Sequence, residues 1–237
     1  MTSEIKPINL TGVNCYLVKT GDGWILIDTG FSTGRAKLEQ ELEAAGCRPG
    51  NLDLILLTHG DSDHADNAAH LRDKYGTKIA IHAADSEMVE RGDMSWNRKT
   101  KPDKVALIFR LMTSIVSLFF KGNTFQTFKP DITVEEGFDL SPYGFDAKVL
   151  HLPGHSKGSI GILTTGGGPS TFPATTVPAL FCGDLLYNLF GRPSCLYIDD
   201  LADFEASIKK LRSIGIGIVY PGHGKPFPLE QFLNKRR

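Results

Sequence analysis

The chain has 237 residues, a formal net charge of −1 at pH 7, and 41% hydrophobic and 22% charged residues. This composition is typical of a folded globular protein and excludes a disordered, collagen-like or small disulfide-rich chain. Because positive and negative charges balance, we expect no nucleic-acid partner.

The cysteines and the first residues of the sequence give expectations about the cellular compartment. Four cysteines are scattered at positions 15, 47, 182 and 195 without a C-x-x-C pair, which argues against a zinc knuckle or a disulfide scaffold. Residues 1–7 lack the basic start and the apolar core of a secretory signal. We therefore expect a cytoplasmic protein.

Apolar runs of β type alternate with helical patterns along the chain, which predicts an α/β architecture. Strands are predicted at residues 14–19, 24–27, 54–57, 78–81, 147–150, 160–163, 179–182 and 216–219. Helices are predicted at residues 34–45, 64–74, 83–91, 105–120 and 201–213. We expect a single domain over residues 1–237, with a segment inserted at about 92–130.

The inserted segment contains an apolar helical pattern at residues 105–120. It is shorter than the roughly 20 residues that a membrane span needs, so we expect no membrane span. Its polar residues recur at i, i+3, i+4 and i+7 and form one narrow stripe on a wide apolar surface. Two interpretations remain open: a lid over a binding site, or a contact between the subunits of a homodimer.

Four side chains with metal-binding chemistry follow the predicted strand at 54–57 within six residues. They are His59, Asp61, Asp63 and His64. Imidazole and carboxylate ligands together suit zinc, iron or manganese, whereas calcium prefers oxygen alone. Taken alone, the run also fits a solvated loop in which an aspartate caps the following helix.

Three further strand ends carry the same chemistry. His155 and His223 each follow a predicted strand on a Pro-Gly turn, and Asp184 follows the apolar run at 179–182. In open α/β folds, ligands gather beyond one end of the strands, where residues distant in sequence meet. The sequence therefore predicts that these residues converge with the turn at 59–64.

This ordered series resembles the metallo-β-lactamase superfamily over nearly the whole chain. The motif Asp28-Thr-Gly, the turn at 59–64 and the three later strand ends match its five motifs. The resemblance implies an αββα sandwich with two divalent metal ions, zinc in the first instance and manganese or iron as alternatives. The implied ligands are His59, Asp61 and His155 for one ion, Asp63, His64 and His223 for the other, with Asp184 bridging both.

The same resemblance implies a metal-dependent hydrolase with a small-molecule substrate. A water between two cations loses a proton near neutral pH, so the expected nucleophile is a metal-bridged hydroxide acting on an ester, lactone, thioester or amide. Asp61 or Asp63 would pass on its proton, Tyr187 would support the oxyanion, and Asp28 would orient a ligand histidine. A di-iron redox enzyme and a phosphodiester hydrolase are the alternatives.

Asp61 departs from the family pattern, which usually has histidine there. A third carboxylate would lower the charge of a site with two divalent cations from +2 to +1. That change would favour manganese or iron and disfavour dianionic phosphate substrates. Alternatively, Asp61 would turn away and leave its metal weakly held.

Overall fold

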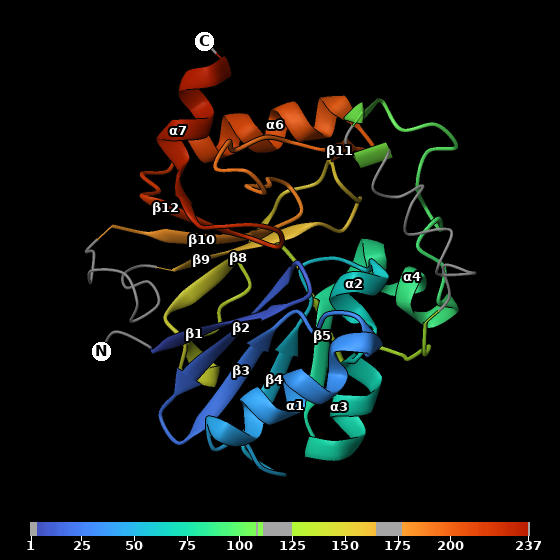
Figure 1. Cartoon of the computed structure of the whole chain (residues 1–237), viewed down its shortest axis with the longest axis vertical. Helices are drawn as coiled ribbons and strands as arrows, with labels where there is room; N and C mark the ends of the chain where they lie inside the picture. The colour runs from blue at the N-terminus through green and yellow to red at the C-terminus, as the bar shows by residue number, and fades with distance from the viewer. Residues whose placement is uncertain (1–3, 108, 111–124, 165–176, 237) are drawn as a thin grey trace.

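Two β-sheets lie face to face in the computed structural model, and helices cover the outer face of each (Figure 1). The structure describes residues 4–107, 109–110, 125–164 and 177–236. The two sheets with their outer helices confirm the predicted αββα sandwich. Within those ranges, no helix combines the length and the apolar character needed to cross a membrane.

The first sheet has six strands in the order β1-β2-β3-β4-β5-β7. The strands are β1 (Ile5–Leu10), β2 (Val13–Thr20), β3 (Gly23–Ile27), β4 (Leu52–Leu56), β5 (Lys78–His82) and β7 (Ile132–Val134). Pairing is antiparallel from β1 to β3 and parallel from β3 to β7. Parallel strands end at the same edge, so the segments after β3 and β4 leave the sheet together.

The second sheet has five strands in the order β13-β12-β10-β9-β8. They are β8 (Ala147–His151), β9 (Ile160–Thr164), β10 (Ala179–Gly183), β12 (Ile218–Pro221) and β13 (Phe227–Pro228). β10 and β12 are parallel and the other pairs are antiparallel. A separate two-stranded ribbon pairs β6 (Lys104–Val105) with β11 (Tyr197–Ile198).

Alternation along the strands explains the layering. In β2, Tyr16 and Val18 belong to the core between the two sheets, whereas Leu17 packs into the core beneath the helices. The helices over the first sheet are α1 (Arg35–Ala44), α3 (Ala68–Tyr75) and α4 (Ser86–Arg91). Helices α6 (Leu201–Arg212) and α7 (Leu229–Leu233) cover the second sheet. A strand alternates its side chains with a period of two, so a two-sided sheet of this kind is apolar on both faces.

All eight predicted strands are present, but two helix predictions were wrong in detail. The expected helix at 64–74 is two helices, α2 (Ser62–Ala65) and α3, because Asn67 breaks the run. Its side-chain amide donates to the carbonyls of Thr29, Gly30 and Phe31, which fixes the chain at the break. The expected helix at 83–91 begins as a 3-10 turn, Ala83–Asp85, before α4.

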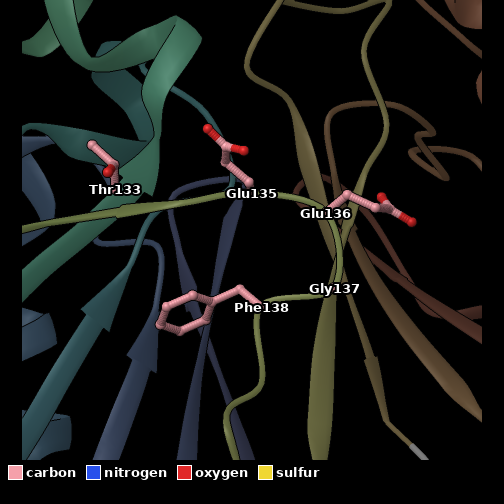
Figure 2. Close-up of a pocket in the computed structure, with 5 residues that line it drawn as sticks. All are labelled: Thr133, Glu135, Glu136, Gly137 and Phe138. Atoms are coloured by element: carbon pink, nitrogen blue, oxygen red, sulfur yellow. The ribbon is translucent and has the colours of Figure 1, made fainter.

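Strands β1, β6, β7, β11 and β13 were not predicted. Most of the expected helix at 105–120 and of the loop at 164–178 lies outside the described residues. A cavity of about 330 Å³ lies along the segment that leads from β7 to β8 and is lined by Thr133, Glu135, Glu136, Gly137 and Phe138 (Figure 2). None of the predicted metal ligands lines it.

Candidate metal centre

The predicted metal ligands meet at one edge of the sandwich, where four strands end. Residues after β4, β8, β10 and β12 supply them, so both sheets contribute. The structure brings these residues together as expected. The ring centroids of His59 and His155 are 4.8 Å apart, and those of His64 and His223 are 5.5 Å apart.

One group consists of Asp63, His64, Asp184 and His223, whose ligand atoms all lie within 4.8 Å of one another. The His223 Nε2 atom is 3.1 Å from Asp63 Oδ2 and 3.2 Å from Asp184 Oδ2. The His64 Nε2 atom is 3.2 Å from Asp184 Oδ1. Two imidazoles and two carboxylates at these separations could share one cation.

The second group consists of His59, His155 and Asp184, again with ligand atoms within 4.8 Å of one another. Asp61 adjoins it: its Oδ2 atom lies 3.0 Å from His155 Nε2 and 3.5 Å from His59 Nε2. Asp61 therefore points toward the two histidines and does not turn away. Asp184 belongs to both groups, as a bridging residue would.

Buried ligand atoms without partners test whether these residues suit a metal. Among the described residues, His59 Nε2, His64 Nε2 and Asp184 Oδ1 are buried and have no hydrogen-bond partner. Buried polar atoms are nearly always paired in folded proteins, so orphaned atoms of this kind call for an explanation. All three belong to the predicted ligands, and a divalent cation would satisfy them.

Asp28 holds both histidines of the 59–64 turn in the tautomer that a metal requires. Its carboxylate accepts from Thr58 N, Thr58 Oγ1 and His64 Nδ1, each at 2.8 Å. Thr58 Oγ1 in turn lies 3.0 Å from His59 Nδ1. A proton on each Nδ1 leaves each Nε2 free to bind a metal. Asp28 is buried and has φ 57°, a strained value for a residue with a side chain.

The two ligand groups differ in the pKa values of their histidines. Burial alone would lower the pKa of His223, but Asp184 and Asp63 raise it to about 10. The pKa of His64 is likewise raised well above its ordinary value by nearby carboxylates, against the effect of burial. Burial lowers the pKa of His155. A cation entering the first group would therefore replace protons.

Arg98 is a member of this site that the sequence did not reveal. Its Nη2 atom lies 2.6 Å from Asp61 Oδ1, and its guanidinium lies 5.1 Å from the ring centre of Tyr197. Burial raises the pKa of Asp61, but the charge of Arg98 and hydrogen bonds from His155 and His59 hold it well below its usual range. The expected charge of +1 counted the ligands alone; if two divalent cations were bound, counting Arg98 as well would give +2.

Asp85 was also missed, because it stands in a short 3-10 turn far from the motifs. It is 1% exposed and accepts from Gly60 N at 3.1 Å, Ser156 Oγ at 2.6 Å and Gly158 N at 2.7 Å. One carboxylate thus joins the turn of His59 to the turn of His155. Its flanking small residues, Ala84 and Ser86, were the only sequence signal.

Tyr187 lies within the site, but its hydroxyl is already engaged. It donates to Asp184 Oδ2 at 2.7 Å, and its ring stacks on His223 with centroids 5.5 Å apart. The ring centroids of Tyr187 and Tyr197 lie 6.5 and 5.4 Å from that of His155. Phe109 contacts the same two tyrosines, at centroid distances of 6.5 and 5.7 Å. We call these three residues the aromatic corner.

A sequence model described as the metallo-beta-lactamase superfamily matches residues 8–223. The chain belongs to the metallo-β-lactamase superfamily. Hydroxyacylglutathione hydrolase GloC of Haemophilus influenzae is 31% identical, with 100% of both chains covered. Acyl-coenzyme A thioesterase MBLAC2 of Bos taurus is 24% identical over 93% of this chain and 76% of its own.

Solved structures of the superfamily share the fold. The class B3 di-zinc metallo-beta-lactamase LRA-12, from an Alaskan soil metagenome, has a TM-score of 0.65 and 16% identity. The match covers 94% of this chain and 76% of that one. The chain is thus a hydrolase-family enzyme with His and Asp groups that could bind metal.

Proposed function

We propose that this protein is a metal-dependent thioester hydrolase that holds two divalent cations, zinc in the first instance. The observation that carries the proposal is the cluster of orphaned ligand atoms, His59 Nε2, His64 Nε2 and Asp184 Oδ1, buried where both sheets end. The di-zinc description of LRA-12, which has the same fold, supports the choice of metal.

Each ligand has a defined task in this proposal. His59, Asp61 and His155 would hold one cation, Asp63, His64 and His223 would hold the other, and Asp184 would be shared by both. When bound, the cations would supply an activated water and a Lewis acid for the developing oxyanion.

The remaining carboxylates and the tyrosine divide the other tasks. Asp61 has partners at both oxygens, Arg98 and the histidines, so it serves as a ligand rather than in proton transfer. Asp63 is more exposed, at 22% of its side chain, and is the carboxylate placed to take up a proton. Tyr187 holds Asp184 in place through its hydroxyl.

The thioester class is favoured by the relatives and by the walls of the site. Two similar proteins are named as a hydroxyacylglutathione hydrolase and an acyl-coenzyme A thioesterase. The aromatic corner beside His155 offers apolar surface for an acyl group. Phe109 comes from the predicted insertion at 92–130, which we propose to be a wall or lid of a single domain.

The first part of that insertion is fastened around the centre. Ser62 N donates to Met94 Sδ at 3.0 Å, Lys99 N donates to the carboxylate of Asp199, and Ala106 N donates to Leu196 O. These bonds place residues 94–106 as a fixed wall.

A substrate panel with metal analysis tests the proposal. The protein is assayed against S-lactoylglutathione, acyl-coenzyme A thioesters, oxyesters, lactones, amides and a phosphodiester, with Asp184→Ala as the inactive control. We expect zinc-dependent hydrolysis of thioesters above the other classes. Preferential phosphodiester cleavage would select that alternative, and a preparation that binds no divalent metal would refute the proposal.

A further inference from the structure

The two residues that flank Arg98 in the sequence, Asn97 and Lys99, are both fixed by hydrogen bonds. The side chain of Asn97 donates to Ala84 O at 3.0 Å, and Lys99 N donates to the carboxylate of Asp199 at 3.2 Å. The Arg98 side chain is only 11% exposed, with its guanidinium over Tyr197. The insertion therefore delivers a fixed positive charge into the candidate metal centre.

The Arg98 guanidinium is buried, but its hydrogen bonds are incomplete. Its Nε atom is buried without a hydrogen-bond partner among the described residues, which carries a desolvation cost. In the part of the chain that the structure describes, its carboxylate partner is Asp61, at Oδ1, while Asp61 Oδ2 faces His155 and His59. The two oxygens of one carboxylate thus face a guanidinium on one side and two imidazoles on the other.

The charges explain why such a pair is useful in this position. A lone buried carboxylate at position 61 would make this metal position more negative than one built from neutral histidines. Arg98 cancels that charge while leaving Oδ2 available. A carboxylate paired with a guanidinium then offers an oxygen ligand with almost no net charge.

We propose that Arg98 is a positioning residue that makes Asp61 an electrically compensated metal ligand. Asp61 and Arg98 form one functional unit, so neither residue is tolerated without the other. The inference rests on the proposed two-metal site. It goes beyond that site in assigning a role to a residue of the insertion.

The test compares zinc binding by four forms of the full-length protein: wild type, Asp61→Asn, Asp61→Asn with Arg98→Met, and Asp61→Asn with Arg91→Met. Asparagine keeps an oxygen ligand but removes the charge, so Arg98 then stands uncompensated beside the cation. Arg91 is the matched control, because it also pairs with a carboxylate, Glu87, and stacks on an aromatic ring, Trp96 at 3.8 Å. Zinc affinity is measured by competition with a chelating dye, and zinc content by elemental analysis.

We expect Asp61→Asn to bind the second zinc ion at least about tenfold more weakly than the wild type, because a buried unit charge repels a nearby cation strongly. Adding Arg98→Met should recover at least about tenfold of that loss, and adding Arg91→Met should recover none. Equal zinc binding by Asp61→Asn and its Arg98→Met double variant would overturn the inference.

Folding provides a second readout from the same variants. If Asp61→Asn fails to fold because of its uncompensated guanidinium, the double variant with Arg98→Met should fold, and failure of both would count against the inference. A wild type that binds no zinc would instead defeat the proposed function. A wild type with two zinc ions and no rescue would defeat only the role of Arg98.

Discussion

Replacing Asp28 with asparagine should disable one metal position while leaving the fold in place. The Asp28 carboxylate accepts three hydrogen bonds of 2.8 Å, two from Thr58 and one from His64 Nδ1, so each of these partners is a donor. In Asp28→Asn, one side of the amide is an NH2 group and must face a donor. If the NH2 group faces His64, Nδ1 must accept a hydrogen bond and cannot carry the proton. The proton then moves to Nε2, which is the atom that would bind a metal.

The magnitude follows from the bonds that are lost. Hydrogen bonds to a buried charged group contribute about 1.5–3 kcal/mol each, and the asparagine keeps part of the set, so we expect a loss of about 2–4 kcal/mol in the stability of the metal-free protein. Loss of such a supporting partner lowers metal affinity about 10- to 100-fold. Zinc affinity is measured by chelator competition and stability by urea unfolding.

Asp131→Asn is the control for that experiment, because Asp131 also accepts from a backbone N–H of the first sheet, Ile79 N at 2.9 Å, but lies outside the ligand groups. It should lower stability without changing zinc affinity. If Asp28→Asn binds both zinc ions as tightly as the wild type, the role assigned to this carboxylate is wrong.

Two other predictions concern close packing and buried thiols. A Cβ at position 222 would collide with Asp184 Oδ1 and lie 2.6 Å from His64 Cε1. Gly222→Ala should therefore lower zinc affinity and activity at least about tenfold. The control Gly215→Ala, which places its Cβ in open space, should change neither. Burial raises the pKa of Cys47 to about 12 from an ordinary value near 9. The folded chain then keeps a proton that the unfolded chain loses, so stability should fall as pH rises from about 9 to 12, by at most about 1.4 kcal/mol per unit from this group. Urea unfolding across that range checks it, and an identical slope in Cys47→Ala would exclude Cys47 as the cause.

The sequence was sufficient for those parts of the site that lie at strand ends. Apolar runs followed by Pro-Gly or Gly-Asp located His155, Asp184 and His223, because a strand end fixes where its next residues point. The spacing within the turn at 59–64 supplied the remaining ligands. The family resemblance supplied the pairing of sheets and the expectation of a second metal.

What the sequence could not supply are contacts made by polar side chains over long separations. Arg98 stands in a polar stretch 37 residues from its partner Asp61, with no local pattern to connect them. Asn67 interrupts a helical periodicity because its partners lie 36 to 38 residues earlier in the chain. Strand β1 alternates buried and exposed residues around a proline, which weakened its strand signal.

Anomalous diffraction from crystals of the zinc-loaded protein tests the two-metal claim most directly. We predict two zinc peaks: one contacted by His59, Asp61 and His155, the other by Asp63, His64 and His223, and Asp184 between them. A single peak, or zinc bound away from these side chains, would contradict the account.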